Sequence, residues 1–291
     1  MYKSRRARKG NGKTKMLVTG KEILDHAKKE NYAVLAPDFW DSNSIRVFIK
    51  AAQDYKQPLM LSFPEALIPF LSLEEAALLG RGYASKATVK VALHLDHGTN
   101  LENIKKAIDL GFTSVMIDAS NEALEENIRK TKEIVEYAHN KGVSVEAEIG
   151  HVGTNESYFD TDSKNIYTQA DQAKSFVDET HVDSLAVSIG TSHGVYTNGT
   201  PHINFDILKE IKESVGVPLV LHGGSGIGDD NLKKCSHLGI NKINVFTDFI
   251  TASMYAVSQA KPNDWIKMLV ASNTGILKVL NDFYKVIIED K

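Results

Sequence analysis

Eight short apolar runs, separated by longer amphipathic segments, constrain the fold of this chain more than any other feature. Most runs are continuously apolar rather than alternating, which is typical of strands covered on both faces. The segments between them, such as NLENIKKAIDLG, repeat apolar residues at helical spacing, and several end in glycine, a residue that favours helix termination. The predicted strands cover residues 32–36, 59–63, 89–95, 113–118, 143–149, 183–189, 218–222 and 241–246.

Eight strand-and-helix units within about 250 residues predict an α/β protein with a (β/α)8 TIM barrel. An open, doubly wound sheet is the alternative, but the count of eight favours the barrel. We expect a single barrel domain over residues 16–291, with an extra C-terminal helix within residues 263–291. Residues 1–15 contain seven basic and no acidic residues, and we expect a disordered basic tail there.

Charge and composition exclude several classes of protein. The formal net charge is −3, so the seven positive charges of the tail leave −10 on residues 16–291, which argues against a nucleic-acid partner. No apolar run reaches the roughly 20 residues that span a bilayer, so we expect no membrane partner. The one cysteine, Cys235, predicts a structural thiol in a helix, which fits a reducing, cytoplasmic location.

Polar residues gather where the predicted strands end. Asp96 and His97 follow the third strand, His193 follows the sixth, and His222 ends the seventh. In a barrel these ends form one rim, where active sites lie. Each histidine alone could be structural, but three imidazoles on one rim are typical of a catalytic zinc site, and Glu148 is an alternative ligand. We interpret His94 as a packed residue and expect surface positions for His26, His139, His181, His202 and His237.

Two further segments have functional patterns. The sequence HGGSG follows the seventh strand and precedes a helix, so its backbone N–H groups could bind a phosphate, although this signal is weak by itself. The connection over residues 150–167 is unusually long, which is typical of a lid or a binding loop.

Six motifs then appear in one order: ALHLDHG, SVMIDAS followed by LEENI, VEAEIG, DSLAVSIGTSHGVY, LVLHGGSGI and KINVFTD. Together they resemble the class II, metal-dependent ketose-bisphosphate aldolases over residues 16–260. The resemblance implies that His97, His193 and His222 bind Zn²⁺ with Glu148 near the metal. It implies that Asp96 and Glu156, the latter on a mobile loop, are the catalytic acid/base groups. It also implies that dihydroxyacetone phosphate is held by Gly194, Gly223, Gly224, Ser225, Asn244 and Thr247.

The implied reaction is cleavage of a ketose (bis)phosphate, a sugar phosphate substrate, to dihydroxyacetone phosphate and an aldehyde such as glyceraldehyde 3-phosphate. Zinc can stabilise the resulting enediolate as a Lewis acid, without a Schiff-base lysine. A monovalent cation as second cofactor and a homodimer or homotetramer are further expectations from the family. A barrel metallohydrolase and a degenerate, non-catalytic family member are the alternatives.

The chain departs from the family pattern on the side of the aldehyde product. Pro64 stands where a serine is expected, Asp38 where an asparagine is expected, and Phe246 where a small or acidic residue is common. In the long loop, Thr154 and Asn155 replace a glycine and an acid. The last arginine is Arg129, so the C-terminal arginine that binds the distal phosphate in some members has no counterpart. These departures leave the identity of the aldehyde open.

Overall fold

The structure is a computed structural model that describes residues 16–150, 152, 167–196 and 199–288. Within these residues, eight parallel strands form one sheet in the order β1-β8-β7-β6-β5-β4-β3-β2. The strands are β1 (Val34–Pro37), β2 (Leu59–Pro64), β3 (Val91–Gly98), β4 (Ser114–Ile117), β5 (Ser144–Ile149), β6 (Ser184–Val187), β7 (Leu219–Leu221) and β8 (Ile240–Val245). All eight predicted strands are confirmed, with ends that differ by up to three residues.

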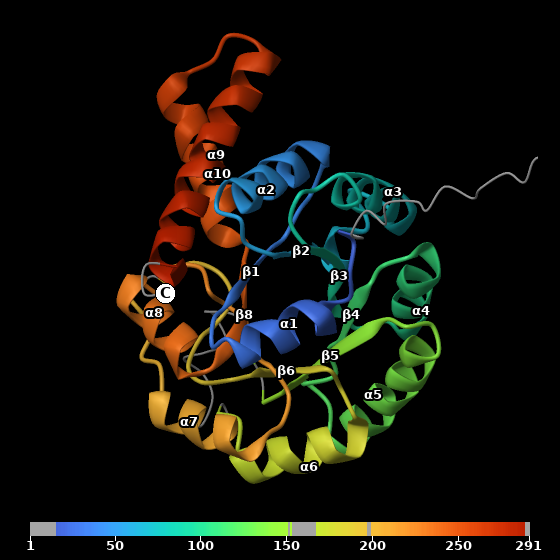
Figure 1. Cartoon of the computed structure of the whole chain (residues 1–291). Helices are drawn as coiled ribbons and strands as arrows, with labels where there is room; N and C mark the ends of the chain where they lie inside the picture. Colours follow the sequence, from blue (N-terminus) through green and yellow to red (C-terminus); the bar gives the residue numbers. More distant parts are fainter. Residues whose placement is uncertain (1–15, 151, 153–166, 197–198, 289–291) are drawn as a thin grey trace, which may run out of the picture.

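The sheet closes between its two terminal strands. Asp38, directly after β1, forms a parallel bridge with Ser62 of β2, and the Phe39 amide donates a hydrogen bond to the Ser62 carbonyl at 2.9 Å. The helices surround the sheet on its outer side (Figure 1). The predicted (β/α)8 barrel is therefore confirmed.

One helix follows each strand on the outside of the barrel. The helices are α2 (Ser42–Asp54), α3 (Leu73–Ala84), α4 (Leu101–Leu110), α5 (Leu124–His139), α6 (Ala170–Thr180), α7 (Phe205–Ser214), α8 (Asp229–Leu238) and α9 (Thr247–Ala260), with a short 3-10 helix η1 (Glu65–Leu67) before α3. Local sequence fixes several of their ends. Asp41 with Ser44, and Ser72 with Glu75, form capping boxes that satisfy the first amides of α2 and α3.

Helix α1 (Gly20–Lys29) covers the N-terminal end of the barrel, where it crosses the opening in the view of Figure 1. Its buried side chains Ile23 and Leu24 belong to an apolar cluster with Met60 and Ala92 of the strands. A Cβ atom on Gly20 would lie only 2.6 Å from the Ser114 hydroxyl, so only glycine permits this close approach. Because this end is filled, the carboxyl ends of the strands form the open face of the barrel.

The predicted extra C-terminal helix is confirmed as α10 (Trp265–Ile288). It packs antiparallel against α9, and the two helices project from the barrel as an arm (Figure 1). Gly275 allows the close approach of the two helices, since a Cβ atom there would meet the Ala252 carbonyl oxygen at 2.3 Å. Among the described helices, none combines the length and the apolar character that a membrane span requires.

Candidate active site

A cavity of about 210 Å³ opens at the carboxyl ends of the strands. The residues that the sequence singled out and that line this cavity are Asp96, His97, His193, Gly194, Gly223, Ser225, Asn244 and Thr247. His222, Gly224 and Glu148 lie next to the cavity in the same region, behind its lining. Glu156, Thr154 and Asn155 fall in the long connection, outside the residues that the structure describes.

An irregularity at the end of β3 explains how neighbouring residues reach one cavity. Successive side chains of a regular strand point to opposite faces, so Asp96 and His97 would diverge. Here the register with β4 shifts between Leu95 and Gly98, and His97 adopts a left-handed φ of 47°. A bulge of this kind redirects a side chain, and strained backbone of this kind gathers at functional sites. The sequence-based prediction ended this strand at residue 95 and was too short.

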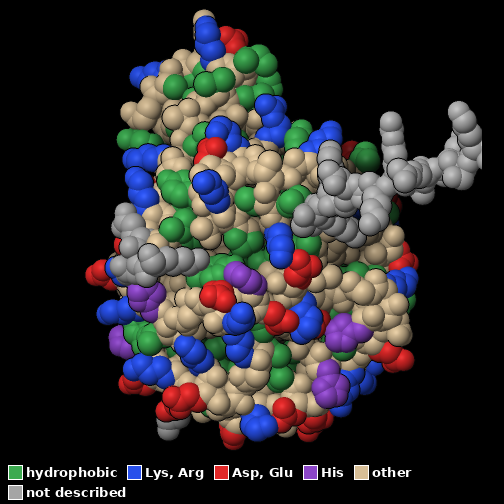
Figure 2. Space-filling model, in the orientation of Figure 1, with side chains coloured by type: hydrophobic (Ala, Val, Ile, Leu, Met, Phe, Trp, Pro, Cys, Tyr) green, Lys and Arg blue, Asp and Glu red, His purple; other side chains and the backbone are tan. Residues whose placement is uncertain are grey.

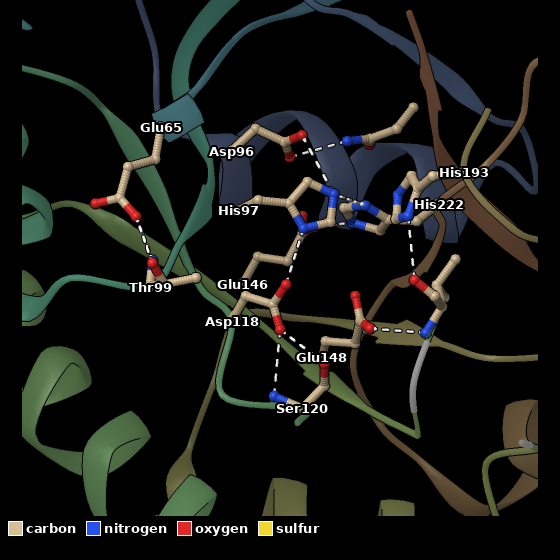
Figure 3. A network of polar contacts seen from close by, with 12 residues as sticks. Glu65, Asp96, His97, Thr99, Asp118, Ser120, Glu146, Glu148, His193 and His222 are labelled. Atoms are coloured by element: carbon tan, nitrogen blue, oxygen red, sulfur yellow. Dashed lines mark hydrogen bonds and ion pairs between the residues drawn. The ribbon is translucent and has the colours of Figure 1, made fainter. Parts of the chain in front are cut away.

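Three imidazoles converge at the cavity floor. The ring centroids of His97 and His222 are 4.5 Å apart, those of His97 and His193 are 4.8 Å apart, and those of His193 and His222 are 5.9 Å apart. Nε2 of His97 lies 2.9 Å from Nδ1 of His222. One ligand atom from each of the three rings lies within 4.8 Å of the others, which is the clustering that a metal ion requires. Figure 3 shows the three rings facing one another.

The second nitrogen of each ring has a partner that fixes the ring's orientation. His97 donates from Nδ1 to Asp118 at 2.9 Å, His193 donates from Nδ1 to the Val152 carbonyl at 3.1 Å, and His222 donates from Nε2 to Glu146 at 3.0 Å. Such outer partners are typical of metal-ligating histidines, because they hold the tautomer in which the other nitrogen faces the ion. The remaining nitrogens are Nε2 of His97, Nε2 of His193 and Nδ1 of His222.

The properties of these rings fit a divalent metal ion. Nε2 of His193 is buried and has no hydrogen-bond partner within the described part of the chain, although a buried polar atom normally has one. Burial and the neighbouring His97 lower the pKa of His193 to about 3, and burial also lowers the pKa of His222. Both rings are therefore neutral near pH 7, as metal ligands must be.

His97 differs from the other two rings. Burial opposes its charged form, but Asp96, Asp118 and Glu148 outweigh burial and raise the pKa of His97 to about 10. In the metal-free protein His97 therefore carries a proton that a bound cation would have to displace.

Glu148 on β5 is a nearby carboxylate with one open position. Its Oε1 accepts a hydrogen bond from the Val152 amide at 3.1 Å, while its Oε2 is buried without a partner. Burial and the negative charge of Asp118 raise the pKa of Glu148 to about 8. With His97 and Asp118 it forms a second group whose ligand atoms are close enough to hold an ion.

Asp96 presents one carboxylate oxygen to the cavity. Its Oδ1 accepts a hydrogen bond from Asn244 at 2.8 Å, which fixes the carboxylate plane. Its Oδ2 is buried without a partner and lies 3.8 Å from Nε2 of His97. Burial opposes ionisation, but His97, His94 and Lys242 hold the pKa of Asp96 well below its usual range. Asp96 is thus an ionised acceptor with a free oxygen beside the three imidazoles.

A buried charged network below the site was not recognised in the sequence. Lys242 of β8 is fully buried and donates to both oxygens of Glu146, at 2.9 and 2.8 Å, and to Nε2 of His94 at 3.1 Å. Lys242 and the neighbouring histidines lower the pKa of Glu146 to about 2, against its burial, so Glu146 is an ionised partner for His222. A lysine inside an apolar predicted strand was the available signal. The interpretation of His94 as a packed residue is confirmed.

The loops after β7 and β8 are joined on the other side of the cavity. Ser225 Oγ accepts hydrogen bonds from the amides of Phe246 and Asp248, at 3.3 and 3.2 Å. Gly223 has a left-handed φ of 67°, and a Cβ atom there would lie 2.5 Å from the Ser192 carbonyl oxygen. Thr247 begins α9 at this point, so a helix N-terminus faces the same corner. Compact glycine-rich backbone beside a helix N-terminus suits an anion such as a phosphate.

Three of the residues that the sequence analysis set apart from the family pattern lie within the described part of the chain, and all three line this same cavity. Pro64 ends β2, Asp38 follows β1 and Phe246 follows β8, so these three residues line the side of the cavity where β8, β1 and β2 are neighbours. Among the described residues that line the cavity, none is a lysine or an arginine.

Comparisons with known proteins agree with this geometry. Residues 18–289 match the family described as fructose-bisphosphate aldolase class II. The fructose-bisphosphate aldolase of Staphylococcus aureus is 41% identical over 251 residues, which cover 85% of this chain and 87% of that protein. A sulfofructosephosphate aldolase of Alkalicoccus urumqiensis is 40% identical over 252 residues, covering 85% of this chain and 88% of that protein.

Solved structures give the same answer. The crystal structure of the YdjI aldolase from Escherichia coli K12 superposes with a TM-score of 0.84 at 36% identity, and the match covers 94% of this chain and 98% of that one. Family, relatives and fold thus agree with a site of three imidazoles and a free carboxylate oxygen at the barrel mouth. The chain belongs to the class II fructose-bisphosphate aldolase family, whose members are metal-dependent enzymes that cleave and form carbon–carbon bonds.

Proposed function

We propose that this protein is a zinc-dependent aldolase that cleaves a ketose phosphate into dihydroxyacetone phosphate and an aldehyde. The observation that carries the proposal is the convergence of three imidazole nitrogens beside the free Oδ2 of Asp96. Three neutral histidines with an open position are typical of catalytic zinc, and the histidine nitrogens suit zinc better than magnesium or calcium. The family assignment favours a lyase over a metallohydrolase or a non-catalytic protein.

His97, His193 and His222 would hold the ion, with Glu148 as an alternative ligand. A bound divalent ion would supply a Lewis acid that stabilises negative charge on the carbonyl oxygen of the substrate. Asp96 would accept the proton of the hydroxyl on the carbon that becomes the aldehyde, and Asn244 would hold Asp96 in place for this step. The phosphate of the dihydroxyacetone phosphate half would bind at Gly194, Gly223, Gly224, Ser225 and Thr247.

The proposal is tested by a metal-dependent cleavage assay. Purified protein is stripped with a chelator, reloaded with Zn²⁺, Co²⁺ or Mg²⁺, and assayed for dihydroxyacetone phosphate release from a panel of ketose 1-phosphates and bisphosphates. We expect cleavage that disappears after chelation and returns with zinc or cobalt. A zinc-loaded protein that releases no dihydroxyacetone phosphate from any member of the panel would overturn the proposal.

A requirement for a monovalent cation stays a prediction. It is tested by measuring cleavage after Na⁺ and K⁺ are replaced with a bulky organic cation.

Glu156 is the proposed second acid/base group, on the long connection after β5. We expect it to move the proton on the reacting carbon of dihydroxyacetone phosphate. Glu156→Gln should then slow solvent proton exchange into dihydroxyacetone phosphate while its binding changes little. Equal losses of exchange and of binding would contradict this role.

A homodimer or homotetramer is the proposed assembly. The arm of α9 and α10 exposes Met254, Tyr255, Trp265, Ile266 and Val270, and Figure 2 shows hydrophobic side chains along this arm. Exposed apolar patches of this kind often mark protein contacts. Light scattering should report a multiple of the 32.1 kDa chain, and a monomer at micromolar concentration would contradict the assembly.

We also propose a cytoplasmic location, supported by the single cysteine, Cys235, which is buried. Fractionation of the native cells tests this location.

A further inference from the structure

We propose that Asp38 binds a hydroxyl group of the aldehyde half on a wall that offers no described cation to a second phosphate, so that the preferred substrate is a ketose 1-phosphate with an uncharged, hydroxylated far end. This inference rests on the proposed aldolase function and specifies its substrate class. It concerns the one wall of the cavity where the chain departs from the family pattern.

Asp38 is held in place by the closure of the barrel. It directly follows β1, its amide donates to the Val245 carbonyl at 3.3 Å, and it forms the bridge with Ser62 of β2. Its backbone is therefore tied to strands on both sides. A residue fixed in this way at the barrel mouth presents its side chain to the cavity with a defined position.

The carboxyl group of Asp38 has an unfilled hydrogen-bonding position. The residue is only 6% exposed and lines the cavity together with Asp96. Its Oδ1 atom is buried and has no hydrogen-bond partner among the described residues. Burial and the neighbouring Asp96 raise the pKa of Asp38 well above its usual range, so Asp38 is a neutral carboxyl group that can both donate and accept a hydrogen bond. Buried polar atoms normally have a partner. A hydroxyl group is the donor that a sugar-derived aldehyde offers at this position.

The neighbours of Asp38 offer nothing that an anion would need. Pro64 has no N–H donor, and Ala66, Leu67 and Phe246 present apolar surface. The lysine nearest to the acids, Lys242, lies below the cavity and is engaged by Glu146 and His94. A phosphate on this wall would face a neutral carboxyl group and apolar surface, without a described lysine or arginine to neutralise the phosphate, which disfavours binding.

The neighbouring corner of the cavity, at the ends of β7 and β8, differs from this wall because it can bind an anion. Gly223, Ser225 and Thr247 provide backbone N–H groups and hydroxyls beside the N-terminus of α9, which suits one phosphate. The described cavity thus offers one corner for an anion and one wall for a hydroxylated chain. The bond between carbons 3 and 4 would break, with the carbon-4 hydroxyl proton passing to Asp96. The bonding electrons would stay with carbon 3, which takes up a proton to give dihydroxyacetone phosphate.

The test compares substrates that differ only in the second phosphate. We would measure kcat/KM for fructose 1-phosphate and fructose 1,6-bisphosphate, and for the matching tagatose pair, with zinc-loaded wild type, Asp38→Asn and Asp38→Leu. Asn keeps the shape and the hydrogen-bonding groups of the neutral carboxyl, whereas Leu removes the hydrogen bond. Asp54→Leu makes the same substitution on the exposed surface of α2, away from the cavity, and serves as the control.

We expect the wild type to prefer the 1-phosphate, and Asp38→Asn to keep this preference because it keeps the hydrogen-bonding groups and changes no charge. Asp38→Leu should lower kcat/KM for the 1-phosphate by roughly 3- to 10-fold, as is usual when one neutral hydrogen bond is lost. Asp54→Leu should leave kcat/KM for both substrates unchanged. If Asp38→Leu does not fold, the wild-type preference for the 1-phosphate is the test.

Two results would overturn the inference. One is a wild type that prefers the bisphosphate, and the other is a folded Asp38→Leu variant whose kcat/KM for the 1-phosphate falls by less than about twofold. Failure of the proposed function looks different, because a zinc-loaded wild type would then neither cleave any ketose phosphate nor exchange the protons of dihydroxyacetone phosphate with solvent. In that case both the proposed aldolase function and the proposed substrate class would be wrong.

Discussion

The two walls of the cavity are built in opposite ways. On the side of β3, β6 and β7, each imidazole has a partner for its second nitrogen, and those partners are themselves held by Ser120, Glu148 and Lys242. On the side of β1 and β2, Asp38 has an oxygen with no partner, and its neighbours Pro64 and Phe246 make mainly apolar contacts.

This difference indicates that the two walls have different functions, one in the chemical step and the other in substrate selection. A preorganised network keeps its geometry when charge develops during a reaction, so the partnered wall suits the chemical step. An open acceptor in an apolar wall is completed only by a ligand, so the other wall suits selection among substrates. Changes to the partnered wall should therefore affect metal binding and turnover for every substrate, whereas changes to the open wall should affect the choice of substrate.

The largest effect is expected for a ligand on the partnered wall. His193→Ala removes a buried nitrogen that has no partner among the described residues, so bound zinc and activity should both be lost. The loss of turnover should exceed the roughly 100-fold limit that is typical for outer partners of a metal site. Metal analysis after dialysis, together with kcat, checks this. A variant that keeps one equivalent of zinc and a tenth of the activity would show that His193 is not a ligand.

Asp96→Asn should separate chemistry from metal binding. The amide keeps the shape of the side chain but cannot accept a proton at neutral pH, so kcat should fall by about 10²- to 10⁴-fold while zinc stays bound. The fall should be the same for mono- and bisphosphate substrates, because both undergo the same proton transfer. Loss of zinc in this variant would instead make Asp96 a metal ligand.

A smaller effect is expected for an outer partner of the metal site. Asp118→Asn weakens the support for His97 without removing a ligand, so zinc affinity should fall by about 10- to 100-fold. Competition with a chelator measures it. Ser120 contacts Asp118 rather than a histidine, and Ser120→Ala removes its hydrogen bond to Asp118. This variant serves as a control, and its effect on zinc affinity should be smaller. An Asp118 variant with unchanged affinity would show that the partnered wall is not preorganised for metal.

The smallest expected effect is the number of protons that the protein releases when zinc binds. Asp96 and Asp118, against the burial of the ring, raise the pKa of His97 to about 10, so the metal-free site is protonated there at neutral pH. A ligand must be neutral, so zinc binding at pH 7 should release about one proton, and affinity should rise with pH toward that pKa. Calorimetry in buffers of different ionisation enthalpy measures the release. A count near zero would mean that His97 is already neutral or is not a ligand.

The fold could be predicted from the sequence because the barrel repeats one signal. Each strand covered on both faces gives a continuous apolar run, and eight such runs leave few architectures open. The end of β3 was placed too early because Asp96 and His97 are polar and the bulge depends on pairing with β4. The closure at Asp38 and Ser62 involves residues of two separate strands, so no local pattern shows it.

The candidate site could be predicted only in part. His97, His193 and His222 were found because each follows a strand of one rim, and the structure brings them together. Asp118 and Lys242 were missed, since their importance comes from which side chains they contact across the barrel. Asp38 was noted only as a departure from the family, and its open oxygen is visible only once the cavity is formed.

A crystal structure of the zinc-loaded protein, with anomalous data collected at the zinc absorption edge, tests the central claim most directly. We predict one strong peak about 2.0–2.1 Å from Nε2 of His97, Nε2 of His193 and Nδ1 of His222, with Oδ2 of Asp96 nearby but not coordinating. Two other groups of side chains are close enough to hold an ion: His94 with Asp96 and Glu146, and His97 with Asp118 and Glu148. A peak centred on either of these, with His193 turned away, would contradict the account.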